Sequence, residues 1–163
     1  MSYMFNNCKK LEKLNISNVD TRNVTDMKNM FCNCRDLIRL NVSSFNTKNV
    51  IDMKKMFSHC KYLFKLNLSN FNTENVNNMS NMFSYCHSLR HLDISSFNTF
   101  YVTNMDKMFY YCDSLEDIED FYFETKNVKN MYDLFFRCSD NTKNKIKNRL
   151  SHLKNKQIYH TKE

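Results

Sequence analysis

The chain has no glycine and no proline among its 163 residues. Tight turns normally recruit both, because glycine reaches positive φ angles and proline fixes φ. The absence of glycine also excludes the glycine-rich loops that cradle phosphates in nucleotide-binding proteins. We therefore expect asparagine to occupy many of the turns, since it tolerates left-handed backbone conformations better than most residues.

Long apolar runs are missing as well. No segment of the sequence is long enough to cross a bilayer as a helix. The first residues do not combine a basic start, an apolar stretch and a small-residue cleavage site, so the chain as given shows no secretory signal. Hydrophobic residues make up 42% of the chain and aromatic residues 14%, which is the composition of a folded domain rather than of a disordered segment.

What the sequence does contain is a repeat, which returns every 26 residues without an insertion. A period of this length predicts a solenoid, in which each unit covers the apolar side of its neighbour. The columns that mark the repeat most clearly are Cys8, Cys34, Cys60, Cys86, Cys112 and Cys138, and Met4, Met30, Met56, Met82 and Met108, continued by Leu134.

Each repeat shows two different periodicities of apolar residues. Alternation of apolar and polar residues, with apolar ones at Leu66 and Leu68, predicts a short strand in which every second side chain points inward. After a polar corner, the spacing changes to three and four residues, which predicts one face of a short helix over 50–60, with Thr47 and Asn49 as N-caps. Successive strand–helix units then predict one parallel sheet with right-handed connections.

The repeat can be written C-x-x-L-x-x-L-x-L-S-x-F-x-T-x-N-V-x-x-M-x-x-M-F-x-x, and over residues 4–138 it resembles a leucine-rich repeat of the BspA-like type. The resemblance implies an α/β fold: a right-handed solenoid of about five 26-residue coils, with a parallel sheet on one face and short helices on the other. It differs from the better-known leucine-rich repeats in one column, where Phe or Val replaces the asparagine that usually forms an internal ladder. Related proteins of this type are often bacterial surface proteins engaged in adhesion or host contact.

The two ends predict how the array is closed. The first coil is incomplete, because the sequence starts part-way through the predicted helix at Met4 and Phe5, and two such open coils could pair. Residues 1–138 form the predicted solenoid and residues 139–163 a basic cap helix and tail. The tail holds seven basic and two acidic residues of a chain whose net charge is +7. The predicted apolar face of the cap helix consists of Ile146, Leu150 and Leu153.

The seven cysteines allow two interpretations. Six lie in one repeat column, where buried free thiols would act as small apolar fillers. The alternative is a disulfide between adjacent coils, which a reducing compartment would prevent. Histidines adjoin this column at His59 and His87, but column cysteines point inward and four ligands would not converge, so we expect no metal and no other cofactor. A Cys–His nucleophile pair is not expected for the same reason.

Outward positions of the strands predict a partner-binding face that changes from basic to acidic along the chain, with Asp113, Glu116, Asp117, Glu119, Asp120 and Glu124 near its acidic end. Ile38 and Phe64 are large apolar residues in a neighbouring column and could anchor a protein contact or be isolated exposed hydrophobes. The segments that connect one strand to the next form the other side of each coil, which we call the crossover side. There, Phe100 and Tyr101, with Tyr110 and Tyr111 nearby, either form an exposed patch or pack on one another. The candidate binding residues are Lys13, Asn15, Arg39, Asn41, Phe64, Lys65, Asn67, Arg90, His91, Asp93, Phe100 and Tyr101.

These features favour a non-catalytic protein-binding module over an enzyme, because a regular solenoid offers a face rather than a cleft. One alternative is an intracellular scaffold. Another is a binder of nucleic acid, another acidic polymer or an anionic membrane surface through a basic tail that includes Lys143, Lys145, Lys147, Arg149, Lys154 and Lys156. We expect a protein ligand and no small-molecule substrate. The resemblance implies the cell surface or secretion, whereas free thiols suit a reducing cytoplasm, so the sequence leaves the compartment open.

Overall fold

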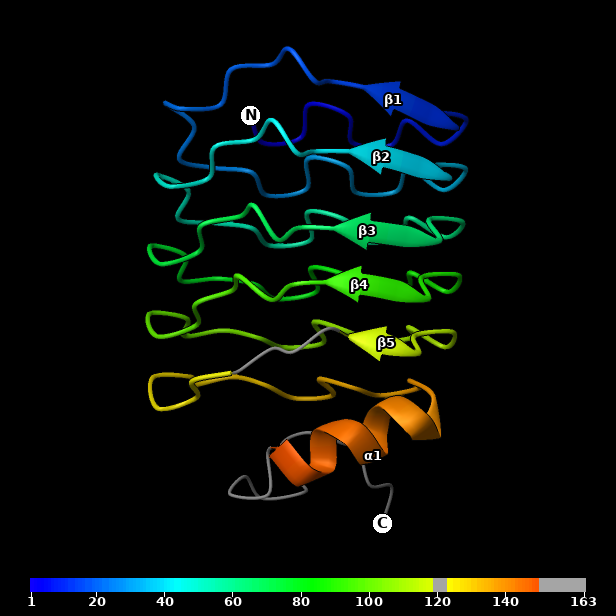
Figure 1. Cartoon of the computed structure of the whole chain (residues 1–163), viewed down its shortest axis with the longest axis vertical. Helices are drawn as coiled ribbons and strands as arrows, with labels where there is room; N and C mark the ends of the chain where they lie inside the picture. The colour runs from blue at the N-terminus through cyan, green and yellow to red at the C-terminus, as the bar shows by residue number, and fades with distance from the viewer. Residues whose placement is uncertain (119–122, 150–163) are drawn as a thin grey trace.

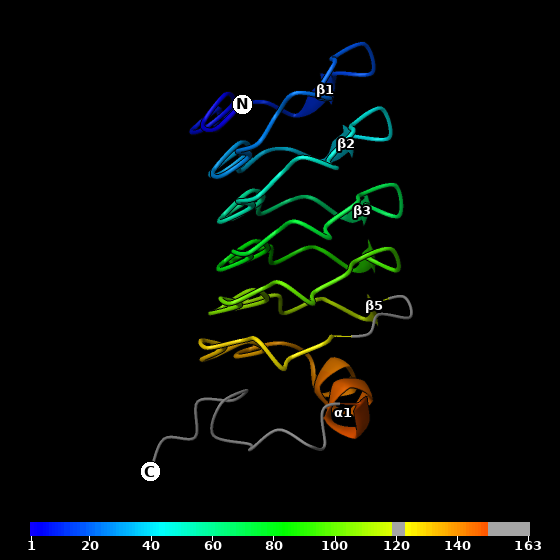
Figure 2. The same ribbon diagram turned by 90° about the vertical axis from the view of Figure 1, so that its left-hand side faces the viewer.

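The computed structural model describes residues 1–118 and 123–149. The chain winds into stacked turns, one per repeat, with the short strands lying one above another along one side (Figures 1 and 2). It consists mostly of short strands and turns, an arrangement compatible with a repeat solenoid. The elements are β1 (Lys13–Asn15), β2 (Arg39–Asn41), β3 (Lys65–Asn67), β4 (His91–Asp93), β5 (Asp117–Ile118) and α1 (Asp140–Arg149).

The strands pair in parallel between residues 26 positions apart. Lys13 pairs with Arg39 in β1 and β2, and Lys65 pairs with His91 in β3 and β4. The expectation of one continuous sheet is wrong, because the strands form a two-stranded sheet, β1-β2, and a three-stranded sheet, β3-β4-β5. The ladder is interrupted between β2 and β3, although the repeat does not change its length there.

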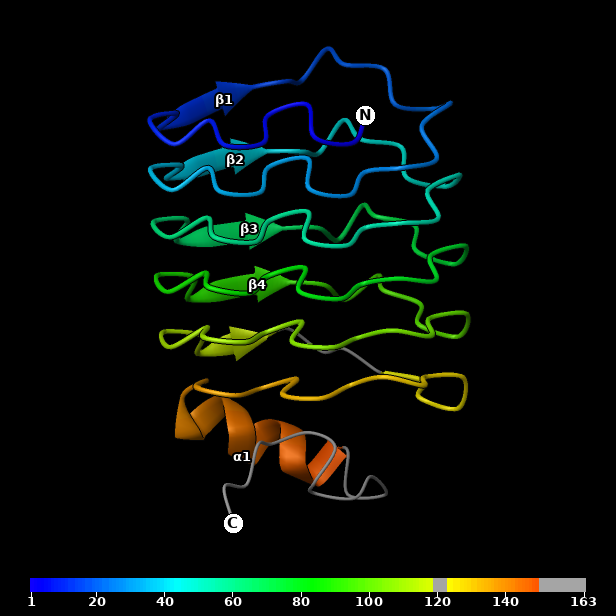
Figure 3. The same cartoon turned by 180° about the vertical axis from the view of Figure 1, so that it is seen from behind.

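The prediction of short helices on the crossover side is also wrong. Each of these segments consists of consecutive turns, and Figure 3 shows them as zigzags crossing behind the strands. In one repeat the amide of Met56 donates to the Met53 carbonyl (3.1 Å) and the amide of Cys60 donates to the Phe57 carbonyl (3.2 Å). The third residue of each turn has positive φ, 55° at Lys55 and 60° at His59, which defines type II turns.

The turns explain why the sequence resembled a helix. The first and last residues of each turn point inward, so two successive turns place apolar residues at Met53, Met56, Phe57 and Cys60, a spacing of three, one and three. An amphipathic helix gives a similar pattern. The amides between these turn bonds donate instead to the next repeat, as the amide of Phe57 does to the Met82 carbonyl (2.9 Å). Such bonds to a neighbouring chain segment are absent from an isolated helix.

Asparagine fills only some of the left-handed positions that the lack of glycine leaves to other residues. Bulky or charged side chains also adopt positive φ, at a cost of roughly 1–2 kcal/mol each. The two columns are Tyr3, Asn29, Lys55, Asn81, Lys107 and Asp133, and Asn7, Asn33, His59, Tyr85, Tyr111 and Arg137.

The core is a strip of identical side chains stacked from repeat to repeat. The rings of Phe31 and Phe57 lie 5.5 Å apart and those of Phe57 and Phe83 lie 5.8 Å apart, nearly parallel in both pairs. The cysteine column runs beside these rings, and from Cys34 onward each thiol of the column donates to a phenylalanine carbonyl of the preceding repeat, as Cys86 does to Phe57 (3.1 Å). Cysteine therefore serves both as an apolar filler and as a donor between repeats.

A second ladder between repeats is made by threonine. Thr73 is buried, its hydroxyl donates to the carbonyl of Asn98 (2.9 Å), and it accepts a bond from the amide of the same residue (2.8 Å). The prediction that this threonine column caps helices is therefore wrong. The column joins neighbouring repeats at the position where the chain leaves the strand side, and its members are Thr21, Thr47, Thr73 and Thr99.

α1 lies at the end of the stack beyond β5 (Figure 1). The hydroxyl of Ser139 accepts a bond from the amide of Thr142 (3.2 Å), which is an N-cap bond. The hydroxyls of Ser139 and Thr142 both donate to the carbonyl of Leu115, and these bonds fix the first turn of the helix on the last repeat. Of the predicted apolar face, Leu150 and Leu153 lie outside the described residues, and the side chain of Ile146 is likewise not described.

Candidate partner-binding surfaces

The basic column of the strand side is positioned by strand register. Lys13 lies beside Arg39 in the first sheet, and Lys65 lies beside His91 in the second. The side chains of Lys13, Arg39 and Lys65 are exposed, while that of His91 is half-buried. The next member of the column is Asp117, whose side chain is not described, so the predicted change to acidic charge stays a prediction. Glu119 and Asp120 lie outside the described residues.

The neighbouring polar column has a role in the backbone. The side-chain oxygen of Asn41 accepts a bond from the amide of Ser43 (3.0 Å), and Asp93 does the same with Ser95 (3.1 Å). These are Asx turns, which end β2 and β4. Asn15 and Asn67 make the same bond. Their role in binding stays a prediction.

Phe64, Arg90 and His91 come together on the strand side, and we call them the Phe64 cluster. Arg90 lies over the Phe64 ring, 5.8 Å from its centroid, and the ring of His91 meets Phe64 edge to face at 5.4 Å. Arg90 also pairs with Glu116 (3.4 Å). The Phe64 side chain remains 46% exposed and Ile38, one repeat away in the same column, 43% exposed. The cluster thus presents apolar surface beside the guanidinium of Arg90.

Phe100 and Tyr101 pack on each other rather than on the other two aromatics predicted near them. Their rings meet edge to face at 4.9 Å. Tyr111 instead stacks on Tyr85 (5.1 Å), and Tyr110 stacks on Phe136 (5.1 Å). Tyr110 and Tyr111 also meet edge to face at 4.7 Å, so the four aromatics form two separate pairs.

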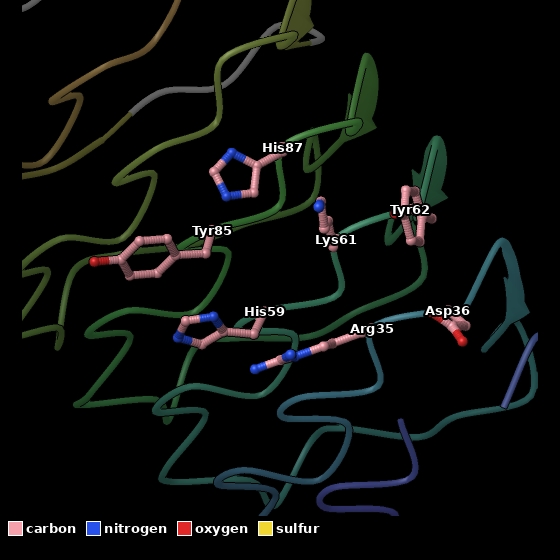
Figure 4. A pocket seen from close by; sticks show the side chains of 7 residues that line it. All are labelled: Arg35, Asp36, His59, Lys61, Tyr62, Tyr85 and His87. Atoms are coloured by element: carbon pink, nitrogen blue, oxygen red, sulfur yellow. The ribbon is translucent and has the colours of Figure 1, made fainter. Parts of the chain in front are cut away.

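A pocket that sequence reasoning did not predict lies beside the starts of β3 and β4. It has a volume of 420 Å³, and we call it the edge pocket (Figure 4). Its lining comes from three consecutive repeats and combines cationic, imidazole and aromatic groups. The columns could have indicated it, because basic residues recur at 35 and 61 and rings recur at 59, 85 and 111. The lining residues are Arg35, Asp36, His59, Lys61, Tyr62, Tyr85 and His87.

All seven cysteines are free thiols, and five of the six in the repeat column are buried. Burial raises the pKa of Cys34, Cys86 and Cys138 to about 12. A thiol that holds its proton at neutral pH is a poor nucleophile and a poor metal ligand. Among residues 1–118 and 123–149, no three His, Cys, Asp or Glu side chains are grouped closely enough to hold a metal ion.

The basic tail is described only at its beginning. The ammonium of Lys143 lies 3.2 Å from the Asp140 carboxylate, and that of Lys145 donates to the carbonyl of Glu116 (3.2 Å). The side chains of Lys147 and Arg149 are not described, and Lys154 and Lys156 lie outside the described residues. In the part of the chain that the structure covers, none of the helices is long and apolar enough to span a membrane.

Comparison with protein families gives one match. The family model described as "Mycoplasma protein of unknown function, DUF285" matches residues 1–91 and, in a second overlapping match, residues 38–149. Two overlapping matches are what a repeating chain produces. Comparisons with curated proteins and with solved structures gave no match.

Proposed function

Because the chain belongs to the DUF285 family, whose function is unknown, we propose from its surface chemistry that it is a non-catalytic module that binds another protein through its strand side. The observation that carries this proposal is the Phe64 cluster. Phe64 stays 46% exposed although Arg90 and His91 pack against it. An exposed aromatic packed against an arginine is typical of the anchor residues of protein interfaces.

The composition of the surrounding face indicates the character of the partner. Arg39 and Lys65 lie next to Ile38 and Phe64 in the sequence and repeat in step with them. Both basic side chains are exposed. A complementary partner would insert an apolar side chain between the two repeats and place carboxylates opposite the basic column.

We further propose that the fold is a right-handed solenoid of five 26-residue coils, of the BspA-like leucine-rich-repeat type. The support is the in-register parallel pairing at a separation of 26 residues and the repeat consensus. By analogy with that type, the partner would be a host or surface protein and the role adhesion. This part of the proposal rests on the resemblance alone.

A site-specific cross-linking experiment tests the proposed face. A photoreactive amino acid replaces Phe64 in one variant and Tyr132, which is 60% exposed on the crossover side, in the control. Each variant is mixed with surface proteins from the native source, and the cross-linked partner is identified by mass spectrometry. We expect a specific product from position 64 and none from position 132.

The identified partner is then produced in pure form and its affinity measured for two pairs of variants. Phe64→Ala and Lys65→Glu should each weaken binding by about tenfold or more. The matched controls Tyr132→Ala and Lys48→Glu should change it less than about twofold, since both residues are exposed away from the strands. Equal effects of the variants and their controls would reject the strand side as the binding face. Binding that survives all four substitutions and disappears with added salt would favour the basic tail instead.

A further inference from the structure

The edge pocket carries an arrangement of charge that the protein-binding proposal does not use. Arg35, Lys61, His59 and His87 line it from three consecutive repeats. We propose that this pocket binds the sulfate or phosphate group of a small, sugar-sized ligand. The site is separate from the Phe64 cluster, so this proposal does not rest on the proposed function.

The cationic groups of the pocket are oriented but not neutralised. The Nε of Arg35 donates to the side-chain oxygen of Asn33 (3.0 Å), which holds the guanidinium along the pocket wall beneath His59 (Figure 4). Within the described part of the chain, no carboxylate lies within 4.0 Å of the guanidinium of Arg35 or the ammonium of Lys61. Asp36 also lines the pocket, but its carboxylate points away from Arg35 in Figure 4.

His59 is held in a fixed position between these charges. Its ring stacks on Tyr85 with the centroids 4.3 Å apart and the planes 9° from parallel. Burial lowers the pKa of His59, and the nearby charges of Arg35, Lys55 and His87 lower it further. The Nδ1 of the neighbouring His87 lies 2.5 Å from the carboxylate of Asp113. The positive charges without a carboxylate partner at the cavity are therefore those of Arg35 and Lys61, and they favour the entry of an anion.

The arrangement of donors favours a tetrahedral oxyanion. Arg35 and Lys61 reach the cavity from different repeats, and the imidazoles of His59 and His87 line it as well. A carboxylate offers two oxygens in one plane, whereas sulfate and phosphate offer three or four in different directions, which suits donors that belong to several repeats.

The size and walls of the pocket indicate that the anion is part of a larger molecule. A volume of 420 Å³ is more than a bare oxyanion fills and lies in the range of small-ligand sites. Tyr62, 47% exposed, and Tyr85 add aromatic surface to the lining. A sugar ester combines the charge, the ring and the hydroxyls that match such walls.

Histidine NMR on the full chain provides the test. The C2 proton of His59 is followed through a pH titration with inorganic phosphate, inorganic sulfate or chloride at equal ionic strength. Phosphate or sulfate should raise the pKa of His59 by about one pH unit, because a nearby anion favours the charged imidazole. His91, on the strand side, serves as the internal control and should not change. No difference between these anions and chloride overturns the proposal.

Affinities measured for glucose 6-phosphate, glucose 6-sulfate and glucose then show which anion is preferred and whether the sugar contributes to binding. The preferred ester should bind more tightly than its inorganic ion, and glucose should not bind. Equal affinity for ester and ion would overturn the sugar-sized part of the proposal.

Substitutions of single residues distinguish a specific binding site from nonspecific attraction to a basic surface. Arg35→Gln and Lys61→Gln should each weaken binding of the preferred ester by about tenfold, the loss expected for one charged hydrogen bond. Lys54→Gln removes the same charge from an exposed side chain outside the lining and should have no effect. Equal losses in all three variants, or none in any, would overturn the proposal. Phe64→Ala should leave ester binding intact, so failure here and failure of the strand-side proposal can be told apart.

Discussion

The strand side and the crossover side of this protein are built from the same repeat, yet they differ in continuity. On the strand side the parallel ladder is interrupted between β2 and β3. On the crossover side, isolated bridges continue through five repeats without a break, from Asp26 through Asp52, Asn78 and Asn104 to Asn130. The side whose pattern indicated a helix thus holds the more continuous ladder between repeats.

The difference shows which side holds the stack together. The crossover side contributes the stacked phenylalanines, the thiol donors and amide bonds to the next repeat. The strand side contributes three-residue strands whose outer side chains are mostly exposed. We therefore expect stability to depend more on the crossover side, and surface variation to be tolerated on the strand side.

Alkaline pH should have the largest effect, because the buried thiols belong to the end of the crossover segment. The pKa of Cys34, Cys86 and Cys138 is raised from 9.0 to about 12 in the folded chain. Below pH 9 both states hold these protons, so stability does not depend on them. Between pH 9 and 12 only the unfolded chain releases them, so stability falls as pH rises. Urea unfolding at pH 8, 9 and 10 measures this fall, and Cys86→Ala should make it less steep.

Phe83→Ala tests the aromatic stack of the crossover side. Phe83 is fully buried between Phe57 and Phe109, so its removal leaves a cavity and should cost about 3–5 kcal/mol of unfolding free energy. The strand-side comparison Leu66→Ala removes a smaller buried side chain and should cost about 2–5 kcal/mol, less than the loss at Phe83. Urea denaturation followed by circular dichroism measures both. A larger loss at Leu66 would reverse the comparison between the two sides.

Thr73→Val tests the ladder at the corner between the two sides. Valine keeps the shape but leaves the amide and carbonyl of Asn98 without their partner, at a cost of about 2 kcal/mol. Thr25→Val, at an exposed position, should change stability by less than about 0.5 kcal/mol. Thermal unfolding of the two variants measures the difference, and equal values would show that the ladder contributes nothing.

Lys55→Gly tests whether the crossover segment consists of turns or forms a helix. Its expected effect on stability is the smallest of the four. At positive φ, glycine relieves strain and should stabilise the fold by about 0.5–1 kcal/mol. Lys54→Gly, one residue earlier and outside the positive-φ positions, should destabilise it by a similar amount. If the segment were helical, both substitutions would destabilise it. Opposite signs in urea denaturation would therefore support consecutive turns.

Part of the candidate sites could be predicted from the repeat columns. Columns place Lys65 next to His91 and Phe64 next to Arg90, and the structure brings all but Lys65 into contact in the Phe64 cluster. For the edge pocket the columns give only the recurring basic residues and rings. Its cavity depends on the position of the Arg35 side chain beneath the His59 ring and on the stacking of that ring on Tyr85, which no spacing rule describes.

The 26-residue repetition by itself determined the parallel register, the identity of the core columns and the free thiols' place among them. Only the tertiary structure decided that the crossover segments are turns and that the strand ladder is interrupted. The reason is physical: inward positions of consecutive type II turns have nearly the spacing of a helix face, so apolar periodicity alone does not separate the two. The choice depends on where the backbone amides find acceptors, and here alternate amides find them in the next repeat.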